Sequence, residues 1–489
     1  MSVTDPNCGV CKTIPMADGR TFEIKHPFPK ALEHFYSLPP LGSDSIPVYR
    51  GNFDHGGNRY RGIITVDLAP RPNLVARGVR EVSFEDGLED PLGTREPARW
   101  VAHDQLSIPT KKVPKPAKTV KKPKKPTGEG LSSGMTAPHL APIDVGDPND
   151  LDYITFFLLN GWHGDDGLNT CYGGHERRGR IDLKLGVWQL RIEPRGDITP
   201  DTLCKHQRAT GDSTVTHIGR IRRNDGAQFA AAEALAVLRV IESLAGFALG
   251  RVTGTVLPVG YRDGQAVWTR WHCNRAIDRP LGGPPFLDPA HTAAQMAELF
   301  RAGYATSSNT LRWQVFRNAL GYHYSAEYDA TVNMKVLLPV SALQLISYAH
   351  LVEELSAGDP NHLTDAQWNS KALGTIGQLR NVLAIVRADT SVPKHLTKLG
   401  KVQADITDMQ TPSPDALDCV VRLRNKVAHP KMKHINKWTT EEWAETGFAA
   451  TTMFNLAMLW WLGYDERFLG KTSEYRGSGD SVHVPWHKA

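Results

Sequence analysis

The chain has 489 residues, 40% of them hydrophobic and 22% charged, which is too long for one hydrophobic core and predicts two or three folded domains. The longest candidate for a continuous apolar stretch, Phe454 to Leu462, is too short to span a bilayer, and the N-terminus lacks a basic region followed by an apolar one. These features argue against secretion and a membrane partner, and six widely spaced cysteines predict a cytoplasmic protein with reduced thiols. The net charge is +5.

Residues 1–108 are expected to form a β-rich N-terminal domain. The segment Arg61 to Leu68, RGIITVDL, has strand composition, and turn signals flank the apolar runs. Near the start, Cys8 and Cys11 form half of a zinc site, but no second Cys-x-x-Cys motif follows. Free thiols are therefore the preferred interpretation, and no cofactor is expected.

Residues 109–142 are expected to be a disordered linker rich in lysine and proline. Eight lysines lie between Lys111 and Lys125, and without them the rest of the chain carries a formal net charge of −3. Such a segment cannot bury enough apolar surface to offset its ordering entropy. It could attract nucleic-acid phosphates, but a solvated spacer is the simpler interpretation.

Residues 143–292 are expected to form a second β-rich domain that contains one long helix and acts as a sensor or regulator. Alternating segments begin at Asp152, Ile181 and His217, which predicts a half-buried antiparallel sheet. A helix is predicted from about Gln228 to Leu249, with Gly250 at its end, and a hairpin around Asp263-Gly264 should follow.

Residues 293–489 are expected to form a C-terminal helical domain with a bundle core at about 337–468. Thr364 and Thr440 are candidate N-caps, and Pro393 fits a first helical turn. The whole chain is thus predicted to be α+β, with antiparallel sheets first and an all-α bundle last. Five helices are predicted for the core: Leu337 to Leu355, Asp365 to Ala388, Pro393 to Ile406, Pro414 to His429, and Glu441 to Leu462.

Arg424 occupies an unusual position for a charged residue. On a helix the neighbouring apolar side chains lie within about 60° of it. An arginine in the centre of an apolar stripe must extend to solvent, find an anionic partner, or face a pocket, because burying an isolated charge is costly. The apolar neighbours are Leu417, Val420, Val421, Val427 and Ala428.

His429 is predicted to stand at the C-terminus of the same helix, because Pro430 disfavours helical geometry at the preceding residue. The helix dipole there favours an imidazolium, so this histidine could act as an acid or a base. Asn425 precedes it by four residues and shares its flank. Arg424 and His429 diverge by roughly 140° on an ideal helix, so they can meet only through a frayed end or across a subunit interface.

The sequence Arg424-Asn425-Lys426-Val427-Ala428-His429 resembles the signature of the HEPN superfamily, in which an arginine and a polar residue precede a histidine by four to six positions. The closing segment MFNLAMLWWLGYDERF is similar to the last bundle helix of related proteins. The order of a β-rich front and a helical tail also resembles the ApeA-type phage-defence proteins, which cause abortive infection. The HEPN resemblance covers roughly a quarter of the chain.

The resemblance implies a metal-independent endoribonuclease that acts as a homodimer in phage defence or as a growth-arrest toxin. His429 would transfer a proton during attack of the RNA 2′-hydroxyl, possible substrates including tRNA, and Arg424 would stabilise the phosphoryl oxygens. Asn425 would orient the histidine or the phosphate. The trigger would be a phage-derived protein or nucleic acid sensed by the β-rich region. Weaker candidates for phosphate contacts are Lys426, Lys431, Lys121, Lys122, Lys124 and Lys125.

Two alternatives remain open. The helical domain could be a catalytically silent HEPN module that dimerises or binds, with β domains that recognise nucleic acid or another ligand. Alternatively, a ligand-binding β-sandwich could carry a helical appendage in which Arg424 is incidental. Spacing alone does not decide, because Arg50 to His55, in a predicted loop, and Arg317 to His323 have similar spacing.

Overall fold

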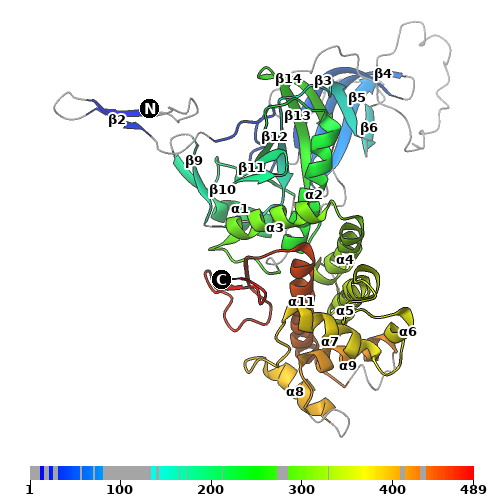
Figure 1. Ribbon diagram of the computed structural model, residues 1–489. Coiled ribbons are helices and arrows are strands. Elements are labelled where there is room, and N and C mark those ends of the chain that lie inside the picture. The colour runs from blue at the N-terminus through cyan, green and yellow to red at the C-terminus, as the bar shows by residue number, and fades with distance from the viewer. Residues whose placement is uncertain are drawn as a thin grey trace.

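The computed structural model describes residues 11–15, 21–25, 31–80, 134–138 and 142–488, apart from short internal gaps, the longest at 273–284, 408–412 and 430–436. Strands occupy the N-terminal and middle regions, and helices occupy most of the C-terminal half (Figure 1). The predicted α+β class is therefore confirmed.

The N-terminal region forms a small hairpin and a four-stranded antiparallel sheet in the order β3-β4-β5-β6. The predicted strand Arg61 to Leu68 corresponds to the second half of β4. Arg50 to His55, predicted to lie in a loop, instead forms the end of β3. The strands are β1 Cys11–Pro15, β2 Thr21–Lys25, β3 Ser45–His55, β4 Asn58–Asp67, β5 Asn73–Arg80 and β6 Gly134–Pro138.

The prediction of a linker over residues 109–142 is wrong for β6. This strand pairs with β5 from Val75 opposite Pro138 to Val79 opposite Gly134. A strand at the edge of a sheet is stabilised by backbone hydrogen bonds to its neighbour and can form without large apolar side chains. Such a strand therefore leaves no apolar pattern in the sequence from which it could be predicted. The lysine-rich residues 109–133 lie outside the described residues.

The middle region is built on an eight-stranded antiparallel sheet in the order β7-β14-β13-β8-β12-β11-β10-β9. Helix α1, Pro200–Thr210, which we did not predict, connects β11 to β12. The strands are β7 Ile143–Gly146, β8 Tyr153–Leu159, β9 Leu168–Tyr172, β10 His175–Leu185, β11 Trp188–Pro194, β12 Val215–Arg223, β13 Gly254–Arg262 and β14 Gln265–Trp271.

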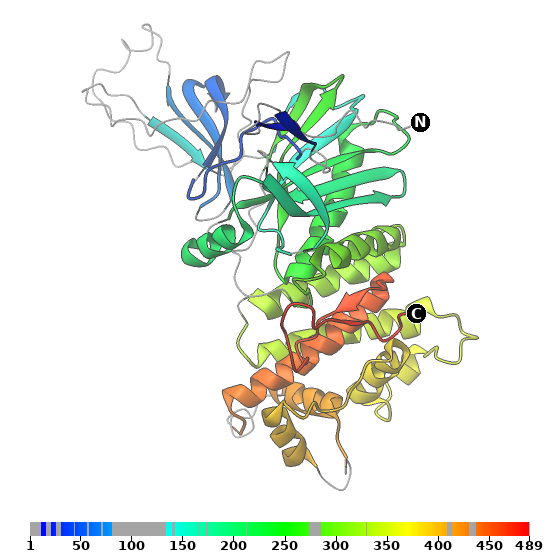
Figure 2. The same ribbon diagram turned by 90° about the vertical axis from the view of Figure 1, so that its left-hand side faces the viewer.

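Both faces of the large sheet are partly covered, but by different layers. Because successive side chains of a strand point to opposite faces, β8 sends Phe156 and Leu158 to one side and Phe157 and Leu159 to the other. The first pair packs with helices α2, Ala231–Leu249, and α3, Thr292–Thr306, and the second pair packs with the four-stranded sheet. Figure 2 shows the four-stranded sheet beside the large sheet. The large sheet is thus the middle layer.

Three predictions for this region are confirmed: the end of the long helix, the hairpin that follows it, and the antiparallel sheet. Helix α2 ends at Gly250 in a left-handed conformation with φ 66°, and β13 and β14 form the hairpin around Asp263-Gly264. The segment that begins at Ile181, predicted to lie in a half-buried antiparallel sheet, does so as the hairpin of β10 and β11, whose turn was not predicted. Gly186, with φ 58°, provides the turn, and Val187 beside it is exposed.

The C-terminal region is a helical bundle around α5, which packs against α4, α7, α9 and α11. A small hairpin, β15 Arg467–Phe468 and β16 Val482–His483, follows the last helix. The helices are α3 Thr292–Thr306, α4 Thr310–Tyr328, α5 Met334–Tyr348, η2 Ala349–Glu354, α6 Asp365–Trp368, α7 Gly374–Val386, α8 Thr397–Ile406, α9 Ala416–Ala428 and α11 Thr440–Leu462.

Several predicted helix boundaries need correction. The helix predicted from Asp365 to Ala388 is broken between α6 and α7, where Gly374 takes a positive φ of 53°. Pro393 lies in a turn ahead of α8, since its carbonyl accepts a hydrogen bond from the Leu396 N–H. Thr364 is an N-cap as predicted, but α11 is capped by Thr439, one residue before the predicted Thr440.

One helical stretch in the described part of the chain, Met334–Glu354, has the length and apolar composition of a membrane span. This stretch was not predicted from the sequence, because polar residues interrupt its apolar ones. It comprises α5 and η2, and 56% of its most apolar window is buried inside the protein. Central helices of helical bundles meet the same criteria, so the feature is weak evidence for a membrane span.

Candidate functional site

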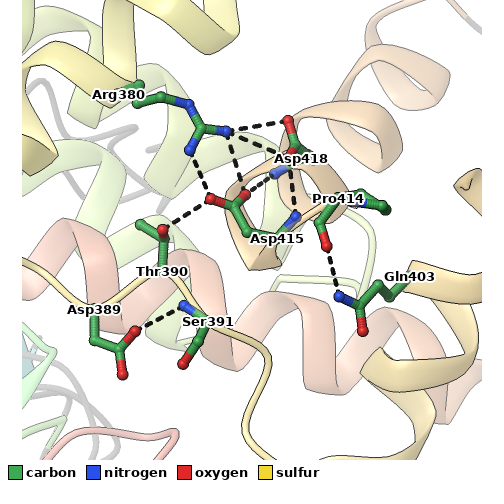
Figure 3. A network of polar contacts seen from close by, with 8 residues as sticks. All are labelled: Arg380, Asp389, Thr390, Ser391, Gln403, Pro414, Asp415 and Asp418. Atoms are coloured by element: carbon green, nitrogen blue, oxygen red, sulfur yellow. Dashed lines mark hydrogen bonds and ion pairs between the residues drawn. The ribbon is translucent and has the colours of Figure 1, made fainter. Parts of the chain in front are cut away.

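Helix α9, which carries the predicted Arg424 and His429 pair, is fixed at its N-terminus by a network of polar contacts (Figure 3). The Asp415 side chain accepts the Asp418 N–H at 2.9 Å, and the Asp418 side chain accepts the Asp415 N–H at 2.9 Å. Arg380 of α7 and Thr390 donate to the Asp415 carboxylate at 2.7 and 2.8 Å. The helix therefore starts at a defined position relative to α7.

The pKa values of the two carboxyl groups in this network are shifted in opposite directions. Burial tends to raise both pKa values, but hydrogen bonds from Arg380, the Asp418 N–H and Thr390 hold the pKa of Asp415 below its usual value of 3.8. The pKa of Asp418 is raised by burial and by the adjacent Asp415. Arg380 contacts both carboxyl groups, at 2.7 Å to Asp415 and 3.3 Å to Asp418, and Asp415 is the one whose ionised form the network favours.

We expect Asp415→Ala to lower the melting temperature of the helical region by about 2–8 °C at pH 7, as loss of an N-cap costs about 1–2 kcal/mol. Circular dichroism during heating measures this change. Asp415→Asn keeps a capping oxygen and should cost less. Because the pKa of Asp415 is lowered, its charge stabilises the fold above pH 3.8, and the difference between wild type and Asp415→Asn should vanish as the pH falls below that value. A difference independent of pH would contradict the assigned ion pair.

Arg424 lies between the buried residues of α9 and the exposed C-terminal end of this helix. Leu417, Val420 and Val421 are fully buried, Arg424 is half-buried, and Ala428 is exposed. The predicted position of the arginine in line with the apolar stripe is therefore confirmed, and its guanidinium lies at the edge of the core rather than at its centre.

The guanidinium of Arg424 is held by amide oxygens. Its Nη2 donates to Gln344 Oε1 of α5 at 3.0 Å, and its Nη1 donates to Asn425 Oδ1 at 3.1 Å. Gln344 in turn donates to Gln378 Oε1 at 2.9 Å, and Gln378 donates to the Trp368 carbonyl at 2.9 Å. This relay of side-chain amides links Arg424 to the interior of the bundle.

The charge of Arg424 has no counter-charge among the residues that the structure describes. The hydrogen-bond partners described for it are neutral, and its Nε is buried without a partner. Burial accordingly lowers its pKa from the usual value of 12.5. A half-buried guanidinium with unused donor capacity is suited to bind an anion such as a phosphate.

His429 occupies the predicted helix end but does not meet Arg424 within one chain. It is the C-cap of α9, with φ −123° and ψ 71°, its N–H donates to the Asn425 carbonyl at 3.0 Å, and its side chain is exposed. The Asn425 side chain binds Arg424, so the structure gives no support to the expectation that Asn425 orients His429. Among the described residues, the hydrogen bonds of the Arg424 side chain go to Gln344 and Asn425 and not to His429.

The weaker site predictions have mixed outcomes. Lys426 lies half-buried on α9, whereas Lys431, Cys8 and the side chain of Cys11 lie outside the described residues. His323 is a core residue that contacts the Phe247 carbonyl at 3.0 Å, and burial lowers its pKa to about 4. The pair of Arg317 and His323 is therefore no catalytic site. The linker candidates Lys121, Lys122, Lys124 and Lys125 also lie outside the described residues.

The two glutamines that extend the hydrogen-bond relay from Arg424 could not be predicted from the sequence. Gln344 and Gln378 lie on different helices and belong to no motif, and glutamine is common on exposed helix surfaces. Only the packing of α5 and α7 against α9 places their amides in line with the arginine.

Comparison with known proteins finds a matching family model for each of the two main regions. Residues 146–282 match the family described as YopA central domain, and residues 310–482 match the one described as YopA C-terminal domain. The first range contains the large sheet except for most of β7, and the second contains α9. The chain is also similar to the SPbeta prophage-derived uncharacterized protein YopA of Bacillus subtilis (strain 168), at 20% identity over 338 residues, covering 69% of this chain and 72% of that protein. No solved structure matches.

Proposed function

We propose that the C-terminal helical region is a metal-independent endoribonuclease of the HEPN type, regulated by the β-rich region. The observation that carries the proposal is Arg424, a half-buried guanidinium held by neutral amides on the helix that ends at the exposed His429. The protein would act in the cytoplasm, where RNA is available. A relative that is prophage-derived fits a role in phage defence or growth arrest.

The proposed reaction needs only proton transfer and stabilisation of charge on a phosphate. His429 accepts the proton of the RNA 2′-hydroxyl, whose oxygen forms a bond to the adjacent phosphorus while the bond from phosphorus to the 5′ oxygen breaks. The departing 5′ oxygen takes up a proton from water and His429 returns its proton to the solvent, which leaves a 2′,3′-cyclic phosphate and a 5′-hydroxyl. Arg424 stabilises the developing charge through its unused donors. DNA is not cut because it lacks the 2′-hydroxyl.

A second copy of the chain is required to complete this site. Arg424 is turned toward Gln344 on α5, whereas His429 is exposed at the helix end. Two copies of α9 related by a two-fold axis would place the histidine of each copy beside the arginine of the other, and two-fold symmetry is the commonest geometry of homo-oligomers. The proposed active form is therefore a homodimer.

A second candidate is a catalytically silent module that dimerises or binds through the same surface. The two hydrogen bonds that hold Arg424 within its own domain favour this candidate, because they give the arginine a structural role without any substrate. The two candidates differ in whether RNA is cut.

The test is incubation of the full-length protein with total RNA and with purified tRNA, in the presence and absence of EDTA. The ribonuclease proposal expects cleavage that EDTA does not inhibit, with products that carry cyclic phosphates. Cleavage that requires a metal ion would overturn the HEPN assignment. If the protein forms dimers but cuts neither total RNA nor tRNA, even after extract from phage-infected cells is added, the catalytically silent module is favoured.

A further inference from the structure

An open cavity of about 380 Å³ lies on the face of the large sheet opposite α2. Tyr153 and Thr155 of β8 line it, whereas the alternate residues Ile154 and Phe156 face the helices. A volume of this size is within the range of about 300–1,000 Å³ that small-molecule sites occupy. The remaining lining residues on this sheet are Arg191, Arg220, Tyr261 and Gly264.

The strand register explains why these side chains meet. Tyr153 pairs with Tyr261 of β13, and their rings stack with centroids 4.6 Å apart and an interplanar angle of 13°. Thr155 pairs with Arg220 of β12, which in turn pairs with Arg191 of β11. The Arg220 guanidinium lies 5.7 Å from the centroid of the Tyr153 ring, so two aromatic rings and a cation form one row.

The opposite wall is the segment from Ala31 to His34, which crosses the sheet. The Ala31 N–H donates to the Cys171 carbonyl at 3.0 Å, and the Leu32 N–H donates to Glu193. The His34 ring contacts the Leu257 carbonyl at 3.1 Å and stacks on Phe157. The wall is thus fixed at both ends, and the cavity is a feature of the folded sheet rather than of a loose loop.

Arg220 supplies an uncompensated positive charge to this cavity. Arg191 is neutralised by Asp182, to which its Nε donates at 2.8 Å, but no described residue forms a hydrogen bond or ion pair with Arg220. Burial, together with repulsion from Arg191 and Arg222, lowers the pKa of Arg220. Such a group is stabilised by an anion placed beside it.

Two further lining residues refine the chemistry of the cavity. The Thr155 side chain is buried beside Tyr261, and a side-chain hydrogen bond between the two tends to lower the pKa of Tyr261. Glu33 also lines the cavity, and its charge adds to burial in raising the pKa of Tyr261. The negative charge therefore acts near the tyrosine end of the row, while the arginine end remains positive.

We propose that this cavity binds a nucleoside phosphate, with the phosphate at Arg220 and the base against the tyrosine pair. Aromatic side chains stack on bases of every kind, and an arginine presents a planar fork of donors to phosphate oxygens. The nucleoside phosphate could be a free nucleotide or a unit of single-stranded RNA. The site belongs to the β-rich region and does not depend on cleavage by the helical region.

Binding of ligands to the full-length protein tests the proposal. Each of the four ribonucleoside triphosphates is titrated by calorimetry, and a labelled single-stranded RNA of about twelve nucleotides is titrated by fluorescence anisotropy. Arg220→Gln removes the charge, and we expect it to weaken binding at least tenfold. Arg222→Gln is the matched control, because Arg222 lies on the same strand and the same face, contacts Gln189 at 2.8 Å, and is exposed.

A second variant, Tyr261→Leu, removes one ring and should weaken binding of the same probe, which keeps the test valid if Arg220→Gln folds poorly. If a triphosphate binds to the wild type and to Arg222→Gln but not to Arg220→Gln, the ligand is a free nucleotide. If only the RNA binds, the ligand is single-stranded RNA. The proposal is overturned if no probe binds at millimolar concentration, or if Arg220→Gln and Arg222→Gln behave alike.

Discussion

Full-length His429→Ala protein should cut RNA about 10²–10⁴-fold more slowly than the wild type, because a positioned acid or base contributes that much to such reactions. Arg424→Ala should cost about 10²–10³-fold, the usual effect of removing one donor to a developing oxyanion. His429 is exposed, so its removal should leave the melting temperature unchanged. The measurement is the initial rate of formation of cyclic phosphate ends.

Matched controls are available in the same region. His395→Ala removes an exposed histidine ahead of α8, and Arg422→Ala removes an exposed arginine two residues before Arg424 on the same helix. Both should retain wild-type rates. If His395→Ala slows cleavage as much as His429→Ala does, the assigned base is wrong.

Mixing the two inactive variants tests whether the site is shared between copies. If the arginine of one chain works with the histidine of the other, a dimer of one Arg424→Ala chain and one His429→Ala chain keeps one intact site out of two. Random exchange makes half of the dimers mixed, so about a quarter of the wild-type activity should return. No recovery after proven exchange would place both groups of each site in one chain.

The elements that could be predicted from the sequence are those with a local cause. The end of α2 at Gly250, the turn at Asp263-Gly264 and the end of α9 at His429 each depend on residues adjacent in the chain. The turn between β10 and β11 was not predicted because Val187 prolongs the alternation of Leu183 and Leu185 by one position, although the buried residues change phase between Leu185 and Trp188. Periodicity within a segment cannot show where that segment folds back.

The features that escaped prediction depend on partners distant in sequence. Arg424 was noticed because its own helix is amphipathic, but the glutamine that binds it, Gln344, belongs to another helix. Likewise Tyr153 and Tyr261 meet only because β8 and β13 are neighbours in the sheet, an order that their composition does not encode. Sequence therefore identifies single unusual residues more readily than the groups around them.

Gln344→Glu should slow RNA cleavage about 10–10³-fold by supplying the counter-charge that Arg424 lacks. The new carboxylate would lie where Gln344 Oε1 now accepts the guanidinium at 3.0 Å, and a neutralised arginine stabilises a developing oxyanion less. The fold should tolerate the change, because partly exposed ion pairs alter stability by only about 0–1 kcal/mol. Cleavage rates and melting temperatures, measured together, separate the two effects.

Gln344→Met provides the control that isolates charge from hydrogen bonding. It has a similar size, removes the same amide oxygen and leaves Arg424 positive, so cleavage should stay within a few-fold of the wild-type rate. If Gln344→Met impaired cleavage as strongly as Gln344→Glu, the amide would act by positioning the arginine. If neither variant changed the rate, the electrostatic role of Arg424 would be excluded, and its hydrogen bonds would be explained by packing of α9 against α5 alone.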